Sequence, residues 1–102
     1  MKLLTKEILA KLPPLYAMDG KPASEVPVVV KFFTPDANAT WYITEGSPED
    51  GDMRFFGLCD LGHGAPELGY VMLSQLASIR GRLGLPVERD RNFSGTLAEV
   101  QS

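Results

Sequence analysis

The sequence predicts an α+β domain, in which an antiparallel β-meander of four to five strands carries two short helices packed on one face. Four apolar, β-branched or aromatic runs follow one another along the chain, separated by turn-forming residues. Their connections are short, and short connections join antiparallel neighbours. Apolar residues at helical spacing precede the first run and follow the fourth. Residues 1–102 have room for one core and are predicted to form a single domain.

Residues 6–12 are predicted to form the first helix. Thr5 is placed to cap its N-terminus, and apolar residues recur every four positions at Leu4, Ile8 and Leu12. Pro13-Pro14 then ends it, because neither ring can donate to a continuing helix.

A second helix is expected to begin with Ser74 as its N-cap. Arg80 lies near the negative end of its dipole, and Gly81 is a natural stop. The tail from Thr96 to Ser102 is predicted to form a last helical turn.

The predicted strands are 27–33, 40–44, 53–58 and 68–73, followed by an extended segment at 87–93. The stretch from Phe55 to Tyr70 is interpreted as the central hairpin, because two apolar runs flank a loop rich in glycine and proline. Residues 45–52 contain four carboxylates and are predicted to form a solvated hairpin tip; they lack the ligand order of a calcium loop.

The composition limits the class of protein and its predicted cellular location. The chain is 44% hydrophobic and 23% charged, which is typical of a soluble globular protein, and its net charge of −3 argues against a broad phosphate-binding surface. One cysteine cannot form an internal disulfide. Charged residues interrupt the N-terminal apolar run, so neither a signal peptide nor a membrane span is expected, and the predicted location is cytoplasmic.

The charged run Glu88-Arg89-Asp90-Arg91 predicts a strand at the sheet edge or beside a cleft, because its side chains would place charges on both faces. Glu88 and Asp90 on one face could bind Mg²⁺ or act as an acid/base pair. We favour an ion-pair role, with cationic partners drawn from Lys31, Arg54 or Arg80. Glu67 is a similar isolated carboxylate, which could extend such a network to Arg89.

Cys59 and His63 are the only cysteine and histidine. A structural zinc site normally needs four ligands, mostly of these two types, and a cysteine nucleophile needs an oriented base. A buried cysteine and an exposed loop histidine explain the pair better. No metal site and no cofactor are predicted.

The aromatic residues of the second, third and fourth predicted strands are Trp41, Tyr42, Phe55, Phe56 and Tyr70. A nucleic-acid platform would also need flanking cations, and strands one to four offer only Lys31 and Arg54. Core packing is favoured, with an exposed subset forming a protein-binding patch. Weak single-stranded nucleic-acid binding is kept as an alternative, in which Trp41→Ala would abolish binding.

Six ordered segments resemble a bacterial family catalogued as domain of unknown function 2958: residues 2–5, 30–36, 40–42, 55–58, 67–70 and 84–90. The resemblance covers nearly the whole chain. It implies a small cytoplasmic protein, often carried on plasmids and other mobile elements, and implies no activity. The family pattern includes Asp36, Trp41, Glu67, Tyr70, Glu88, Arg89 and Asp90, but not Cys59 or His63.

These observations lead to three hypotheses. The first is a non-enzymatic interaction protein whose partner is another protein, with an accessory role for a mobile element, regulatory or directed against host defence. The second is a metal-dependent enzyme or binder that uses Glu67, Glu88 and Asp90 with Asp36 nearby. The third is the nucleic-acid binder. Enzymatic activity is disfavoured, and the seven family positions form the candidate binding surface.

Overall fold

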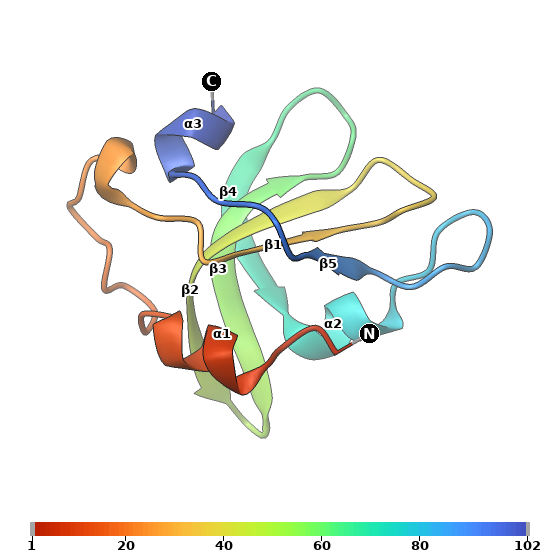
Figure 1. Ribbon diagram of the computed structural model, residues 1–102, viewed down its shortest axis with the longest axis horizontal. Helices are drawn as coiled ribbons and strands as arrows, with labels where there is room; N and C mark the ends of the chain where they lie inside the picture. The colour runs from red at the N-terminus through yellow and green to blue at the C-terminus, as the bar shows by residue number, and fades with distance from the viewer. Residues whose placement is uncertain (1, 102) are drawn as a thin grey trace.

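Five antiparallel strands form one open sheet in the computed structural model, which describes residues 2–101 (Figure 1). The strands lie in the order β4-β3-β2-β1-β5. The elements are α1 (Lys6–Lys11), the 3₁₀ turn η1 (Ala23–Glu25), β1 (Val30–Phe33), β2 (Thr40–Glu49), β3 (Asp52–Asp60), β4 (Glu67–Met72), α2 (Leu73–Ser78), β5 (Glu88–Asp90) and α3 (Leu97–Gln101). The predicted α+β class and antiparallel meander are confirmed.

The charged strand β5 is an edge strand, as its sequence predicted. It pairs only with β1, through Lys31↔Asp90, Phe32↔Arg89 and Phe33↔Glu88. The predicted hairpin around residues 55–70 also forms, as the antiparallel pair β3 and β4. Its interpretation as the central hairpin was wrong, because β4 is the opposite edge and β2 lies in the middle of the sheet.

One face of the sheet, which we call the helix face, carries the main core. Its buried residues include Phe32, Ile43 and Phe55, each fully buried. Ile8 from α1 and Leu76 from α2 pack against the same cluster, so both predicted helices cover this face. A six-residue helix such as α1 does not persist alone in water, and this packing holds it in place.

The opposite face carries a second, smaller cluster that the sequence did not predict. Val26, Leu58 and Leu97 are buried there, and Ala23 and Val100 pack against them. The turn η1 and helix α3 therefore cover part of this face, beside one another in Figure 1. None of the helices within residues 2–101 is long and apolar enough to cross a membrane.

The helix ends partly follow the predicted caps. The Thr5 hydroxyl accepts the Ile8 N–H at 3.2 Å, so the first cap is confirmed. Arg80 lies beyond the end of α2 and donates to the carbonyls of Ala77 and Ile79. Ser74 is not the N-cap of α2: the helix begins at Leu73, and the Ser74 hydroxyl donates to the Asp52 carboxylate instead.

The acidic stretch 45–52 is mostly strand, which corrects the predicted solvated loop. β2 continues to Glu49, and only Asp50 and Gly51 form the turn, with φ of 50° and 79°. Positive φ at both central residues is the geometry of the two-residue hairpin turn that Asp-Gly favours. Glu45 is consequently inside the sheet and 2% exposed.

A β-bulge at Thr44 brings the backbones of β2 and β3 close together. The register shifts between Ile43 and Glu45, and the Thr44 hydroxyl donates to the Phe56 carbonyl at 3.3 Å. Gly57 lies opposite Ile43, and a Cβ placed on it would be 1.9 Å from the Tyr42 carbonyl oxygen. No side chain fits at position 57 unless the strands move apart.

We expect Gly57→Ala to lower the free energy of unfolding by about 1–3 kcal/mol, because overpacking strains the strand pair. Gly69, its cross-strand neighbour on β4, is a matched control, because a Cβ there meets nothing within 4 Å. Gly69→Ala should be neutral or stabilising by up to about 1 kcal/mol. Urea unfolding of both variants measures the difference, and equal destabilisation would contradict the close approach at Gly57.

Candidate functional sites at the two sheet edges

The seven predicted surface residues do not converge on one site. Glu88, Arg89 and Asp90 lie on β5, whereas Glu67 and Tyr70 lie on β4 at the other edge. The register places Arg89, Phe32, Trp41, Cys59 and Glu67 in one row across all five strands. Four strand spacings separate Arg89 from Glu67, on the order of 15–20 Å at the backbone, so the two side chains cannot form the network suggested from sequence.

Trp41 is a core residue and not a surface residue. It is 4% exposed and belongs to the helix-face cluster with Phe32 and Ile43. Inward-facing positions alternate along a strand, so Trp41 and Tyr42 point to opposite faces. The proposed aromatic platform therefore lacks its largest ring, which corrects the candidate surface at this position.

Asp36 ties the loop after α2 to the turn between β1 and β2. Its Oδ2 accepts the N–H groups of Leu83 at 2.6 Å and Leu85 at 3.3 Å. Its Oδ1 is buried without a hydrogen-bond partner in the described part of the chain, and a Cβ on Gly81 would lie 1.5 Å from that oxygen. Glycine suits position 81 because a side chain there would collide with the Asp36 carboxylate. Its backbone does not have the positive φ of a glycine that ends a helix. Asp36 holds a loop, and it is far along the chain from the residues it holds.

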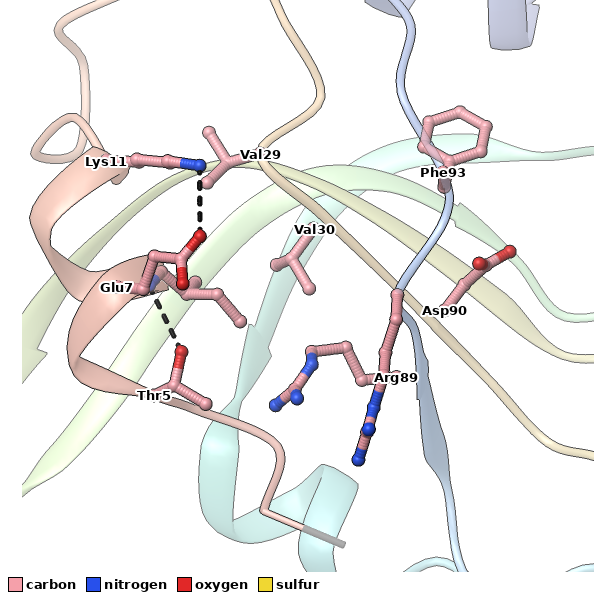
Figure 2. A pocket seen from close by; sticks show the side chains of 10 residues that line it. Thr5, Glu7, Lys11, Val29, Val30, Arg89, Asp90 and Phe93 are labelled. Carbon is pink, nitrogen blue, oxygen red and sulfur yellow. Dashed lines mark hydrogen bonds and ion pairs between the residues drawn. The ribbon is translucent and has the colours of Figure 1, made fainter.

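A groove lies between α1 and β5. Its volume is about 400 Å³, and we call it the α1–β5 groove. Figure 2 shows Glu7 and Lys11 on one wall, Arg89, Asp90 and Phe93 on the other, and Val29 and Val30 between them. Arg89 and Asp90 therefore border a cleft. The charged run predicted a position either at the sheet edge or beside a cleft, and these two residues have both.

Ion pairs occupy both carboxylates of the groove. Lys11 lies 3.4 Å from Glu7 on the exposed side of α1. Lys31 lies 3.7 Å from Asp90 and also 5.6 and 5.4 Å from the ring centres of Tyr42 and Phe93. The expected ion pair of Asp90 with Lys31 is confirmed.

A second site, the β4 patch, consists of Tyr16, Arg54, Phe56, Leu68 and Tyr70. Tyr70 packs against Phe56 with ring centres 5.1 Å apart, and the Arg54 guanidinium lies 4.9 Å from the Tyr70 ring centre. A side-chain hydrogen bond to Tyr16 raises the pKa of Tyr70. Leu68 and Tyr70 are 48% and 46% exposed, so this patch is aromatic, cationic at one end and open to solvent.

The segment after α1 completes the patch. Its Leu15 N–H donates to the Ser47 hydroxyl at 2.9 Å and its Met18 N–H donates to Glu45 Oε2 at 3.3 Å, which fixes Tyr16 between them. Leu15, Tyr16 and Glu45 line a small hollow beside Tyr70. Sequence reasoning missed these residues, because it assigned Glu45 to a loop. The Asp50-Gly51 pair could have revealed this, because it marks the hairpin turn and so extends β2 to include Glu45.

Cys59 lies on β3, and His63 lies in the loop that follows it. Burial raises the pKa of the Cys59 thiol, and its sulfur lies 3.9 Å from the Gly57 carbonyl oxygen. His63 is exposed in the loop after β3. Within residues 2–101 no group of three or more histidine, cysteine, aspartate or glutamate side chains is placed to hold a metal ion.

The fold and these surfaces define a small α+β domain built on one open sheet, with a charged groove at one edge and an aromatic patch at the other. The chain belongs to the DUF2958 family of proteins of unknown function, whose model matches residues 3–99. This confirms the family that the six sequence segments resembled. No curated protein and no solved structure matches the chain.

We expect Cys59 to react slowly with iodoacetamide in the folded protein. A raised pKa lowers the thiolate fraction at pH 8, and the thiolate is the nucleophile. The alkylation rate at pH 8 should be at least about fivefold lower than that of the same protein unfolded in urea. Mass spectrometry over a pH series measures it, and equal rates in the two states would contradict the burial of the thiol.

Asp36→Ala should lower the free energy of unfolding by about 1.5–3 kcal/mol, because two N–H groups lose a charged acceptor. Hydrogen exchange at the Leu83 and Leu85 amides should accelerate in parallel. Asp36→Asn keeps one acceptor oxygen and should lose less than half as much. If Asp36→Ala left both amides as protected as in the parent protein, the loop would be held by other contacts.

Proposed function

We propose that this protein is a non-enzymatic binding module that holds an extended segment of a partner protein against strand β4. One observation carries the proposal: β4 is an open edge strand whose one charged residue, Glu67, stands at its beginning, and exposed aromatic side chains border it. Pairing of a partner strand with such an edge supplies main-chain hydrogen bonds, and neighbouring side chains add specificity.

The two edges of the sheet differ in how they are protected. β5 has three residues, all charged, and short charged edges resist pairing with other chains. In β4, Glu67 is followed by five uncharged residues, and the ladder with β3 is regular throughout. Proline, lysine and bulges, which usually guard an edge, are absent from β4. An unguarded edge of this kind is consistent with use as an interface.

The side chains beside this edge have the composition of an interaction surface. Tyrosine and arginine are enriched at the energetic centres of protein interfaces, and the β4 patch contains Tyr16, Tyr70 and Arg54. The Phe56 ring and the Arg54 guanidinium both pack on Tyr70, which limits its motion before binding. A side chain that is already ordered loses less entropy when a partner covers it.

The charges around β4 indicate the chemistry of the occupant. Glu67 lies exposed at the beginning of the strand, and no ion pair with it is found among the described residues. An extended apolar segment with a basic residue beside Glu67 would complement this edge.

The two alternative functions have less support. A carboxylate metal site needs Glu67 close to Glu88 and Asp90, and these lie at opposite edges. A nucleic-acid platform needs exposed rings flanked by cations, whereas Trp41 is buried and Arg54 is engaged by Glu49 at 3.4 Å. A cytoplasmic location and an accessory role for a mobile element, regulatory or directed against host defence, are further parts of the proposal that come from the family resemblance.

Peptide selection tests the proposed surface. Random twelve-residue peptides displayed on phage are selected on the parent protein, and the affinities of the winning peptides are compared with two variants. Leu68→Glu places a charge beside the β4 edge and should weaken binding at least about tenfold. Leu83→Glu makes the same change at an exposed leucine on the loop after α2 and should leave affinity unchanged within about twofold.

Hydrogen exchange of the complex locates the peptide. We expect slower exchange at the amides of residues 67–72 when a selected peptide is bound. Equal binding by Leu68→Glu, or protection confined to other residues, would refute the β4 site. If the free protein is a dimer and Leu68→Glu dissociates it, the segment that pairs with β4 belongs to a second copy of this chain and not to a different protein.

A further inference from the structure

The β-bulge in β2 turns Glu45 toward the β4 patch. Trp41 and Ile43 belong to the helix-face core, and strict alternation along the strand would place Glu45 on that face as well. The register shift between Ile43 and Glu45 instead places Glu45 opposite Phe56 on β3. Phe56 in turn lies opposite Tyr70 on β4. Residues directly opposite one another share a face, so these three side chains form one row across three strands.

The segment after α1 encloses a small space over this row. We call it the Tyr16–Tyr70 hollow, and the residues that line it are Leu15, Tyr16, Asp19, Glu45, Phe56 and Tyr70. A hydrogen bond between the side chains of Tyr16 and Tyr70 joins the segment to β4. The volume of the hollow is about 20 Å³, which is room for one water-sized group. Three aromatic rings and two carboxylates therefore surround a space that is too small for a ring.

The Glu45 carboxylate is buried at this hollow and only partly satisfied. The residue is 2% exposed, and its Oε2 accepts the Met18 N–H at 3.3 Å. Its Oε1 has no hydrogen-bond donor among residues 2–101. Within the same residues, neither Glu45 nor Asp19 forms an ion pair with a lysine or arginine. Since buried charges in proteins are normally paired, a cation in the hollow would complete this carboxylate.

The lining selects a primary ammonium group among the possible cations. The faces of tyrosine and phenylalanine rings attract cations, and a neighbouring carboxylate adds to that attraction. A lysine ammonium is compact and has three N–H donors, whereas a guanidinium is a planar fork that exceeds a water-sized space. The one cation already on the Tyr70 ring, Arg54, does not line the hollow and is paired with Glu49.

We propose that the Tyr16–Tyr70 hollow binds the ammonium group of a lysine side chain in the segment that pairs with β4. The source of the lysine rests on the proposed function, whereas the ammonium site rests on the hollow alone. A strand paired with β4 runs about 4.8 Å from it. The four-carbon stem of a lysine on that strand can lie along the exposed ring of Tyr70, with its charged head in the hollow.

Nα-acetyl-lysine methylamide is the probe, because the ammonium group is its only charge. Amide NMR shifts of the full chain measure its binding. We expect saturable shifts confined to residues 15–19 and to the strand positions around Glu45, Phe56 and Tyr70. The norleucine analogue keeps the stem without the charge and should give no saturable shifts. The arginine and trimethyllysine analogues keep the charge with a larger head and should bind several-fold more weakly.

Two variants test the lining. Glu45→Gln keeps the shape and an acceptor for the Met18 N–H, and it should weaken binding of the probe about tenfold or more. Glu25→Gln is the matched control: it removes the same charge at an exposed position of η1 outside the hollow, and affinity should change less than about twofold. Tyr16→Gly removes one ring at a position with φ of 73°, so it should weaken binding at least about threefold without lowering the free energy of unfolding.

Three results would overturn the ammonium site. They are equal weakening by Glu45→Gln and Glu25→Gln, binding of the norleucine analogue as tight as that of the lysine probe, and the absence of saturable shifts up to about 50 mM probe.

The peptides selected on β4 separate this inference from the proposed function. Replacement of lysine by norleucine in those peptides should weaken binding at least about fivefold in the parent protein and less than about twofold in Glu45→Gln. If the replacement changes nothing while the amides of residues 67–72 stay protected, the lysine contact is refuted and the β4 interface stands. If no peptide is selected but the probe binds in a Glu45-dependent way, the β4 interface is refuted and the ammonium site stands.

Discussion

The burial of Phe32, Ile43 and Phe55 on one face of the sheet is the interaction on which the other features depend. These fully buried side chains form the centre of the main core, and a sheet face of this kind must be covered. Leu76 from α2 and Ile8 from α1 cover it. Because α1 is too short to be stable alone, the core determines where it lies. The α1–β5 groove is then a consequence of that docking, since α1 is one of its walls.

The two edges of the sheet carry surfaces of different composition. At β5 the strand is short, every residue is charged, and Asp90 pairs with Lys31. Aromatic and aliphatic side chains gather at β4, on a longer and regular strand. The β2 bulge supports the second surface, because it places Glu45 opposite Phe56 and lets it accept the Met18 N–H. The segment that carries Tyr16 is thereby fastened beside Tyr70.

Local sequence patterns predicted most of the helices and strands, but fewer of the contacts between them. Thr5, Arg80 and the alternating charges of 88–90 act over a few residues, and their roles were visible in the sequence. Ser74 was misassigned because its partner, Asp52, lies 22 positions away. Residues 45–49 were misassigned because charge was weighted above the Asp50-Gly51 turn signal. Trp41 was placed on a candidate surface, although its strand position alone does not say which face is covered.

By itself, the sequence determined the α+β class, the antiparallel order of neighbouring strands and the edge position of the charged strand. These follow from periodicity, turn chemistry and the cost of burying unpaired charge, which act within a short stretch of chain. Only the tertiary structure decided which edge stays open, which aromatic rings are exposed, and that residues 5–11 and 89–93 face each other across a groove. Such contacts join residues distant along the chain, and they are set by how the whole core packs, which no local pattern encodes.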